Sequence, residues 1–341
     1  MKKITIIGPL PEPKGGVSIH IIRLGKLVSK QFDIQFIDES FIIKDEYFNI
    51  RSKNLFRYLR MLWNTDIVHI HSGVTLLRII HLITGRLARN KIVVTLHAFE
   101  PRSAFEEWLN KIFLKLAHQI IVVSSEIQSR IALNSTVLKP AFLPPDTEDE
   151  PALPTNISNW LANAKQRGDF LIGANAFRID FHNGNDLYGI DMCIELMKAL
   201  VHDHDMSVSL IFVLASLSKS EQSFNRYQQL IQDWHLEKNV LLTSEDTSFV
   251  RLIKELDLVV RPTCTDGDAL TIREALYLDK PVIASDVVGR PENTIVFRNR
   301  DANDFKEKAL AAISNNSSTT GAQVSRKSYQ NFYLELYTQL H

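Results

Sequence analysis

The sequence has no excess of charge of either sign. Its 341 residues include 39 lysines and arginines and 39 aspartates and glutamates, so the formal net charge is zero. A general nucleic-acid binder relies on a global positive field, which this composition excludes. Any anion that the protein binds must therefore be held by local groups.

Cysteine is scarce. Only Cys193 and Cys264 are present, far apart and without CxxC spacing. Two such cysteines provide neither a disulfide framework nor a cysteine-based zinc site, and they are typical of a reducing compartment. We therefore expect a cytoplasmic protein.

Long hydrophobic runs are also missing. No segment approaches the roughly 18 apolar residues that span a bilayer. The basic start, MKKITIIGPL, has an apolar run that Gly8 and Pro9 interrupt, which is too short for the core of a secretory signal. With 45% hydrophobic and 23% charged residues, the composition is that of a globular protein.

Short apolar runs alternate with longer amphipathic segments along the whole chain. Runs such as KITIIG, DIVHIH and KIVVTLH, and later VSLIFVLA, LDLVVRP and KPVIASD, are typical of strands buried on both faces of parallel sheets. Residues 144–168 begin with an acidic, proline-rich stretch that indicates a linker. A chain of this length is expected to form two α/β domains.

The segment RPTCTDGDALTIREAL, residues 261–276, places charge around the predicted start of a helix. Backbone N–H groups near Ala269 and Leu270 and the positive end of the helix dipole suit a diphosphate. Glu274, one turn farther on, can accept hydrogen bonds from two ribose hydroxyls. Asp266, before the turn, is placed to accept hydrogen bonds from further hydroxyl groups of such a ligand.

A simpler alternative assigns these carboxylates structural roles. Asp266 and Asp268 would cap the helix, since aspartate is a favoured cap, and Glu274 would form a surface ion pair.

The segment resembles a signature of glycosyltransferase family 4, a group of retaining GT-B enzymes that use nucleotide sugars. In that family a strand leads into an E-x7-E pattern, followed by GKPVIAS. Here Asp266 stands at the first glutamate position, Gly267 keeps the turn and Glu274 stands at the second, before KPVIAS. Because aspartate is shorter than glutamate, the resemblance leaves the donor sugar open.

Family-like segments occur in both halves of the chain, so the resemblance implies the GT-B fold. This α/β fold has two Rossmann-like domains whose parallel sheets face each other across a cleft. We expect an acceptor-binding domain over residues 1–150, completed by a crossing helix over 325–341, and a nucleotide-sugar-binding domain over 165–320. Ligands of such sheets bind at the carboxyl ends of the strands.

A glycine pair follows the first predicted strand in GPLPEPKGGVSIH. Gly15 and Gly16 open the next helix, and glycine lets a backbone approach a ligand without a clash from Cβ. The segment is not GxGxxG, which argues against NAD or FAD. In the resembled family this loop approaches the donor phosphates and the acceptor, although such a pair can also be a plain turn.

The segment GANAFRIDFHNGNDLYGID resembles the family pattern GRLxxxKG, whose arginine and lysine neutralise the nucleotide diphosphate. Arg178 matches the arginine and can bind phosphate through two hydrogen bonds, with a surface ion pair as the alternative. Tyr188 stands at the lysine position, so the second cation must come from elsewhere, from Arg261 or from Lys14. The long intervening loop, which contains His182, is a candidate for selecting the donor.

Histidines end two predicted strands. His97 follows KIVVTL and matches a histidine that the family places near the donor sugar, with a structural role as the alternative. His69 and His71 share one face of their strand by its two-residue period. No third ligand is spaced to join them and the resemblance implies metal-independent transfer, so we predict no metal site. Ser124 is expected to cap the helix that follows IIVVSS.

The segment RSKNLFRYLRMLW, residues 51–63, interleaves basic and aromatic residues. Such a helix can lie on an anionic membrane leaflet, although an amphipathic helix packed on its sheet is commoner. Because enzymes of the resembled family often use lipid-linked acceptors, we expect peripheral contact with the inner face of the cell membrane.

The resemblance implies transfer of a hexosyl group from a UDP-, GDP- or dTDP-sugar to a hydroxyl of a glycan or polyprenyl-linked glycolipid. Transfer would proceed with retention and without a cofactor, in bacterial cell-surface polysaccharide synthesis such as that of O-antigen or capsule. The expected catalytic residues are Asp266, His97 and Arg178, and the expected donor-binding residues are Gly15, Gly16, Arg178, Ala269, Leu270 and Glu274. Two alternatives remain: a nucleotide-sugar 2-epimerase of the same fold, and a non-catalytic partner subunit of a glycosyltransferase complex.

Overall fold

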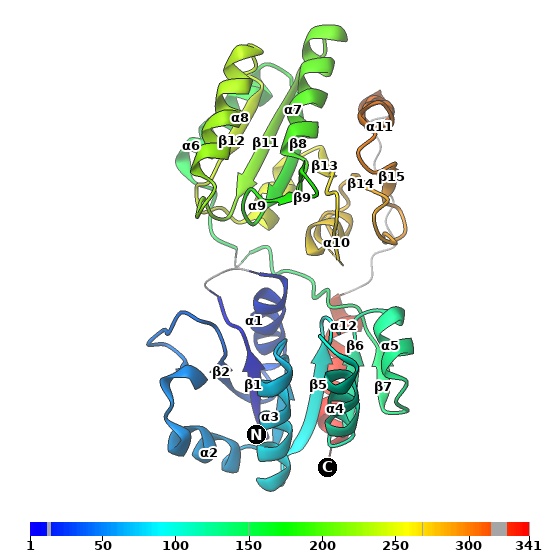
Figure 1. The fold of residues 1–341 in the computed structure, drawn as a ribbon. Coiled ribbons are helices and arrows are strands. Elements are labelled where there is room, and N and C mark those ends of the chain that lie inside the picture. The colour runs from blue at the N-terminus through cyan, green and yellow to red at the C-terminus, as the bar shows by residue number, and fades with distance from the viewer. Residues whose placement is uncertain (12–14, 149, 268, 315–325, 341) are drawn as a thin grey trace. The chain divides into compact units, whose positions relative to one another are not determined.

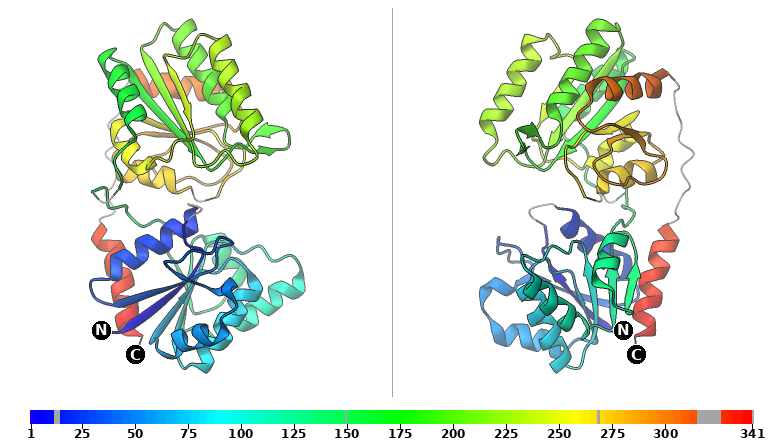
Figure 2. Two further views of the ribbon diagram at one scale, coloured as in Figure 1. Left: turned by 90° about the vertical axis from the view of Figure 1, so that its left-hand side faces the viewer. Right: turned by 45° about the vertical axis from the view of Figure 1, so that its right-hand side comes forward.

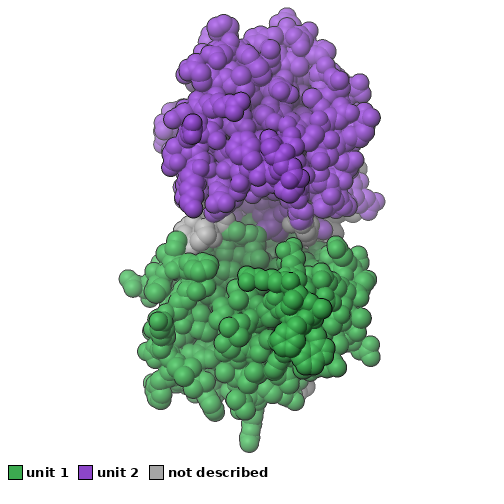
Figure 3. Space-filling model, in the orientation of Figure 1, with its two compact units in different colours: residues 1–144, 325–341 green, residues 145–324 purple. Residues whose placement is uncertain are grey.

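A computed structural model of the chain describes residues 1–11, 15–148, 150–267, 269–314 and 326–340. The chain divides into two compact units (Figure 3). Unit 1 comprises Met1–Pro144 with Ser325–His341, and unit 2 comprises Pro145–Val324. Each unit is built on a parallel β-sheet with helices on both of its faces (Figures 1 and 2).

The sheet of unit 1 has the strand order β3-β2-β1-β4-β5-β6-β7, with every neighbouring pair parallel. Its strands are β1 (Lys3–Gly8), β2 (Asp33–Asp38), β3 (Phe48–Asn49), β4 (Ile67–Ile70), β5 (Lys91–Leu96), β6 (Gln119–Val122) and β7 (Thr136–Leu138). All of β4 and all but the first residue of β5 are buried. Continuous apolar runs form such strands because helices cover both faces of the sheet.

Helices of unit 1 connect these strands and cover the sheet. They are α1 (Gly16–Val28), α2 (Leu55–Trp63), α3 (Thr75–Leu87), α4 (Ala104–Leu114), α5 (Ser125–Ile131) and α12 (Arg326–Gln339). Ser124 accepts a hydrogen bond from the N–H of Ile127 at 3.3 Å, which confirms its predicted role as the cap of α5. The hydroxyl of Tyr337 on α12 lies 2.6 Å from Nδ1 of His69. The last helix therefore packs on the first sheet.

The main sheet of unit 2 has the strand order β12-β11-β8-β13-β14-β15, again parallel throughout. Its strands are β8 (Phe170–Ala176), β11 (Val208–Leu214), β12 (Val240–Thr243), β13 (Leu258–Arg261), β14 (Val282–Ser285) and β15 (Ile295–Phe297). A small antiparallel hairpin joins β9 (Phe181–His182) to β10 (Asn185–Asp186). All of β11 is buried, as its run VSLIFVL predicts.

Helices also cover both faces of the second sheet. They are α6 (Thr155–Gln166), α7 (Ile190–Lys198), α8 (Glu221–Asp233), α9 (Phe249–Glu255), α10 (Leu270–Tyr277) and α11 (Ala302–Ser314). Separate apolar cores lie on the two sides: Phe212 belongs to one, and Ile211, the preceding residue of β11, belongs to the other. Successive side chains of a strand point to opposite faces, so one strand supplies both cores.

The predicted fold class, two α/β domains with parallel sheets, is confirmed. The short strands β3, β7 and β15 were not predicted from the sequence. Each has only two or three residues and lies at the edge of its sheet, where a strand needs little apolar sequence of its own.

Candidate functional site

In unit 2, the carboxyl ends of β8 and β13 lie at one edge of the sheet, followed in the chain by the loops that carry the candidate residues. The two strands pair in parallel, with Ile172 opposite Leu258. Helix α10 begins after Ala269, and within the described part of the chain no side chain caps it. Its first turn therefore keeps backbone N–H donors of the kind that bind anions.

Asp266, before this helix, lies between two arginines. Arg261 donates to both carboxylate oxygens, from Nε to Oδ2 at 3.2 Å and from Nη2 to Oδ1 at 3.1 Å. Arg290 donates from Nη1 to Oδ2 at 2.8 Å, and the Thr263 hydroxyl donates to the same oxygen at 3.2 Å. Burial alone raises the pKa of Asp266, but the two arginines outweigh burial and hold it below the usual value.

This network argues against a capping role for Asp266. The residue at the N-cap of α10 is Ala269, whereas Asp266 Oδ1 accepts from the N–H of Gly267 at 3.0 Å. The other predicted cap, Asp268, lies outside the described residues. Asp266 is thus the counter-ion of two arginines.

Arg290 belongs to the site but was missed in the sequence. Its side chain is 2% exposed and donates to the backbone oxygen of Ser285 at 2.8 Å and to its hydroxyl at 3.2 Å. The one signal for it was a charged residue in the turn after the buried strand KPVIAS. That signal does not show which carboxylate the arginine contacts, because Arg290 and Asp266 are distant in the sequence and meet only in the folded unit.

Arg178 lies just after β8. It donates from Nε and Nη2 to Oδ2 of Asp180, at 3.2 and 2.9 Å, and the two side chains are 42% and 44% exposed. The surface ion pair considered above is therefore present. An exposed pair of this kind contributes only about 0–1 kcal/mol, so a phosphate group can replace Asp180 as the partner of Arg178 at small cost.

Tyr188, at the family's lysine position, lies against Arg261. The guanidinium carbon of Arg261 is 5.3 Å from the centroid of the tyrosine ring, within cation–π range. Nη1 of Arg261 also donates to the backbone oxygen of Asn175 on β8 at 3.3 Å. Of the two candidates for the missing cation, Arg261 thus lies beside Tyr188, while Lys14 lies outside the described residues.

The loop between Arg178 and Tyr188 is the hairpin of β9 and β10. Buried Asp186 accepts from the N–H groups of Tyr188 and Gly189 at 2.9 and 2.8 Å, and from the hydroxyl of Tyr227 at 2.6 Å. Burial raises the pKa of Asp186. His182 is exposed in this hairpin. The hydrogen bonds of Asp186 thus anchor a hairpin whose histidine faces solvent.

Glu274 is buried in α10 rather than exposed on its surface. This placement argues against the surface ion pair considered from the sequence. On the same helix, Thr271 Oγ1 donates to Oδ1 of Asn175 at 2.9 Å, which ties the helix start to the end of β8. Asn175 is a second site residue that the sequence did not single out.

In unit 1, Gly15 is the N-cap of α1 and Gly16 is its first residue. The N–H of Gly15 donates to the hydroxyl of Ser18 at 2.8 Å. The nearest described atom to a Cβ built at Gly15 would be that hydroxyl oxygen, at 3.9 Å. Neither space nor backbone angle demands glycine here, since its φ is −126°. The ligand role of the glycine pair therefore stays a prediction.

Three histidines converge at the carboxyl ends of β4 and β5. His20 comes from α1, His71 follows β4 and His97 follows β5, and one ring nitrogen from each lies within 4.8 Å of the other two. The expectation that no third ligand joins His69 and His71 is therefore wrong for His71, which has His20 and His97 beside it. Spacing along the chain cannot show that a helix residue folds onto two strand ends.

His69 does not belong to this group. Its Nδ1 lies 2.6 Å from the hydroxyl of Tyr337, and its Nε2 lies 2.8 Å from Oγ1 of Thr95. Both of its ring nitrogens already have partners, so the pairing of His69 with His71 that their spacing suggested forms no joint site.

The basic aromatic segment forms α2 with a 3₁₀ turn, η1 (Ile50–Ser52), before it. Tyr58 and Leu62 are buried, so the helix packs on unit 1. Phe56, Arg60 and Trp63 are exposed, and their spacing of four and three residues places them on one outer stripe. The helix therefore has a buried face and an outer face that is both aromatic and basic.

Three consecutive apolar side chains are exposed after β2. Phe41, Ile42 and Ile43 are 86%, 55% and 59% exposed. The guanidinium carbon of Arg51 lies 4.0 Å from the ring centroid of Phe41. We call residues 41–43 the apolar loop.

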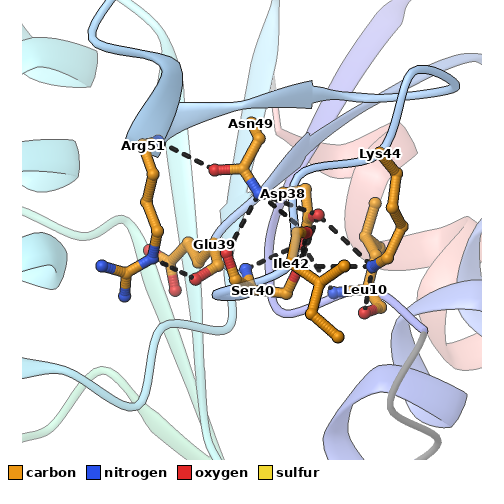
Figure 4. A network of polar contacts seen from close by, with 8 residues as sticks. All are labelled: Leu10, Asp38, Glu39, Ser40, Ile42, Lys44, Asn49 and Arg51. Atoms are coloured by element: carbon orange, nitrogen blue, oxygen red, sulfur yellow. Dashed lines mark hydrogen bonds and ion pairs between the residues drawn. The ribbon is translucent and has the colours of Figure 1, made fainter.

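A buried carboxylate holds the base of the apolar loop (Figure 4). Asp38 accepts from the N–H groups of Leu10 and Ser40 at 3.0 and 2.8 Å, from the hydroxyl of Ser40 at 2.6 Å and from Nδ2 of Asn49 at 3.1 Å. Lys44 Nζ lies 3.4 Å from the same carboxylate. The backbone at the start of the apolar loop is thus held by hydrogen bonds, while its apolar side chains are exposed.

Unit 1 also contains a pocket of about 640 Å³ beside the segment that follows His97. It lies among the start of α3, the loop after β5 and α4. Apolar side chains, including Leu76 and Phe105, share its wall with charged side chains of both signs. The charged residues are Arg78, Arg102, Glu100 and Glu106. A ligand with an apolar part and polar groups would match this mixed lining.

Two family models match the chain, one in each unit. Residues 182–315 match Glycosyl transferases group 1, and residues 16–135 match Glycosyltransferase Family 4. The poly(ribitol-phosphate) alpha-N-acetylglucosaminyltransferase of Staphylococcus aureus (strain COL) is 26% identical over 133 residues, which are 37% of this chain and 26% of that protein. The match thus spans about a quarter of that relative's length.

Solved structures share the fold along the whole chain. Anabaena Alr3699/HepE in complex with UDP and glucose has a TM-score of 0.72 at 15% identity, over 99% of this chain and 100% of that one. A glycosyltransferase from Rickettsia africae ESF-5 has a TM-score of 0.75 at 17% identity, over 99% and 98% of the two chains. The units, their parallel sheets and both family matches lead to one conclusion: the chain belongs to the family 4 and group 1 glycosyltransferases of the GT-B fold.

Proposed function

We propose that this glycosyltransferase moves a hexosyl group from a nucleotide sugar to a hydroxyl of a glycan or polyprenyl-linked glycolipid, with retention at the anomeric carbon. The observation that carries the proposal is the edge of unit 2 where the start of α10, which no described side chain caps, follows a loop held by paired arginines. Backbone N–H groups and guanidinium groups suit the diphosphate of such a donor. The complex of the similar Anabaena protein with UDP supports UDP as the first nucleotide to test.

In the bound state, we assign the donor diphosphate to the amides near Ala269 and Leu270 and to Arg178, which exchanges Asp180 for phosphate. Arg261, beside Tyr188, supplies the positive charge that the family's lysine would supply. Glu274 accepts the ribose hydroxyls.

Asp266 acts mainly as a positioning residue. Its Oδ1 accepts two hydrogen bonds and its Oδ2 accepts three, so a sugar hydroxyl can reach it only by displacing a protein donor. The carboxylate instead holds Arg261 in place for the phosphates.

The mechanism rests on stabilising the leaving diphosphate. Charge develops there as the bond to the anomeric carbon breaks, and preorganised donors lower the energy of that state. Arg178 and the α10 amides serve this role, while Gly15 and Gly16 approach the phosphates and His97 faces the transferred sugar, as the resemblance implies. The leaving diphosphate itself accepts the proton of the attacking hydroxyl, so no metal ion is required.

We assign the acceptor to the pocket beside His97 in unit 1. Its apolar wall suits a polyprenyl chain, and Arg102 suits the phosphate that links the chain to a glycan. An acceptor of this kind would place the enzyme in the assembly of bacterial cell-surface polysaccharide such as O-antigen or capsule.

Such an acceptor resides in a membrane, and unit 1 carries a surface that fits one. The outer stripe of α2 and the apolar loop offer aromatic, aliphatic and basic side chains on neighbouring segments. None of the helices among the described residues is long and apolar enough to cross a bilayer. We therefore propose peripheral contact with the anionic inner face of the cell membrane.

The membrane contact is tested by vesicle sedimentation. Arg57 and Arg60 are both exposed on α2. Each basic residue near an anionic surface contributes about 1 kcal/mol, so Arg57→Gln with Arg60→Gln should weaken binding to phosphatidylglycerol vesicles roughly 30-fold. The matched control, Arg226→Gln with Arg298→Gln on unit 2, should bind like the unsubstituted protein. Equal loss in both double variants would contradict the assignment of the contact to α2.

The donor is identified by a thermal-shift screen of UDP-, GDP- and dTDP-sugars. A ligand at a hundred times its Kd stabilises the native state by about 2.7 kcal/mol, which raises Tm by roughly 5–10 °C for a domain of this size. We expect one nucleotide class to do so. If no nucleotide shifts Tm, the chain is better explained as a non-catalytic partner subunit.

Products from a labelled donor separate transfer from epimerisation. Transfer consumes the nucleotide sugar only when an acceptor is present and labels the acceptor. Conversion of the donor to an isomeric nucleotide sugar without acceptor would instead identify a 2-epimerase.

A further inference from the structure

We propose that His20, His71 and His97 form a binding site for a divalent transition metal ion within unit 1. The site lies at the carboxyl ends of β4 and β5, with α1 supplying the third ligand. Its test measures metal binding alone and so can fail or succeed separately from the transfer reaction proposed above, in which His97 also takes part.

The arrangement of the rings matches metal coordination. Their centroids are 5.2 Å apart for His20 and His71, 4.9 Å for His20 and His97, and 5.3 Å for His71 and His97. Three imidazoles bound tetrahedrally to zinc through bonds of about 2.0–2.1 Å have ring centroids about 5 Å apart. The triangle of rings therefore already has the size that a single ion requires.

The hydrogen bonds leave lone pairs for the ion. Nδ1 of His20 lies 2.6 Å from the backbone oxygen of Ala141, which can only accept, so Nδ1 carries the proton and Nε2 carries the lone pair. Among the described residues, the buried Nε2 atoms of His20 and His71 have no hydrogen-bond partner. Buried polar atoms rarely lack a partner, and a metal ion would satisfy the His20 nitrogen directly. The Ala141 carbonyl is also the usual kind of group that orients a metal-bound histidine.

His71 and His97 need only a small adjustment. Nδ1 of His71 lies 3.0 Å from Nε2 of His97, so one shared proton links the two rings. Ligand nitrogens of a tetrahedral site lie about 3.3 Å apart, so slight separation and a change of tautomer in one ring allow both to face an ion.

The environment favours an ion that prefers imidazole. Three neutral nitrogen ligands suit zinc, copper or nickel better than magnesium or calcium, which prefer oxygen. His97 is partly exposed, whereas the other two histidines are buried. Solvent can therefore supply the fourth ligand on the His97 side, as in zinc sites with three protein ligands.

The test measures zinc bound to the full-length protein. Protein treated with EDTA is equilibrated with zinc, passed through gel filtration and analysed for metal content. We expect one zinc ion per chain, and visible absorption typical of tetrahedral coordination when cobalt replaces zinc. His20→Asn should lower zinc affinity at least about tenfold, while the control His204→Gln, at an exposed histidine outside the site, should leave it unchanged.

A second variant guards against loss of folding. His97→Gln changes a partly exposed side chain and should also lower zinc affinity, with an unchanged circular dichroism spectrum. The proposal is wrong if the unsubstituted protein retains no zinc, or if the His20 and His97 variants retain as much as the unsubstituted protein does.

Discussion

Arg178→Ala is expected to lower kcat/KM for sugar transfer by roughly 10²–10³-fold, the loss seen when one preorganised donor to a developing negative charge is removed. The fold should persist, because the ion pair that the substitution breaks is exposed and contributes little to stability. The measurement is transfer from a labelled nucleotide sugar, together with the Tm of the variant. Binding of nucleotide diphosphate should weaken in parallel.

Arg167→Ala is the matched control. Arg167 is 40% exposed, against 42% for Arg178, and it pairs with the aspartate two residues later, Asp169, at 2.6 Å. Asp169 is only 4% exposed, against 44% for Asp180, so the control variant is assayed well below its own Tm. It precedes β8, whereas Arg178 follows that strand, so the two arginines lie at opposite ends of it. Full activity in both variants, or equal loss in both, would reject the diphosphate role of Arg178.

Glu274→Gln tests the ribose contact in the same assay. Glutamine keeps the size of this buried side chain, whereas alanine would leave a cavity in α10. We expect a lower affinity for the donor and a much reduced rate. An unchanged KM for the nucleotide sugar would argue against the ribose assignment.

Asp266→Ala is expected to give the largest loss of stability. Arg290 and Arg261 are 2% and 12% exposed, and the substitution would leave both without this counter-ion. Breaking a buried ion pair by removing one partner costs about 3–5 kcal/mol, which lowers the Tm of a domain of this size by roughly 6–20 °C. Unfolding of the full chain, followed by calorimetry and by tryptophan fluorescence, measures the change.

Asp301→Ala and a change of pH serve as controls. Asp301 pairs with exposed Arg298 and accepts from the N–H groups of Asn303 and Asp304 at 3.1 and 3.0 Å at the start of α11. Its loss should therefore cost about 1–2 kcal/mol, less than the loss of Asp266. Because the pKa of Asp266 is lowered in the folded protein, its stabilising effect is present above the unfolded pKa of about 4 and is lost as the pH falls through the folded pKa. The difference in free energy of unfolding between the unsubstituted protein and Asp266→Asn should therefore become smaller as the pH falls. A larger difference at low pH would contradict the stabilising role assigned to the ionised Asp266 carboxylate.

Much of the fold follows from local sequence. Runs such as KITIIG and VSLIFVL can be strands only if both faces are buried, and their alternation with amphipathic segments requires helices on both sides of parallel sheets. The edge strands β3, β7 and β15 could not be predicted in this way. They pair with a neighbouring strand that exists only after the sheet has formed.

Part of the site also follows from local sequence. The start of α10 near Ala269, the opening of α1 by the glycine pair and the position of Arg178 after β8 are all local features, set by residues within a few positions of one another. Their proposed roles in donor binding rest on that local geometry and on the family resemblance.

The sequence by itself thus determined two parallel α/β sheets and the loops at the carboxyl ends of their strands. Only the tertiary structure decided which side chains meet there: Arg290 with Asp266, Arg261 with Tyr188, and His20 with His71 and His97. The physical reason is the range of the interactions. Hydrophobic period and helix capping act between residues a few positions apart, whereas these ion pairs and ring contacts join segments that only the folded sheets bring together.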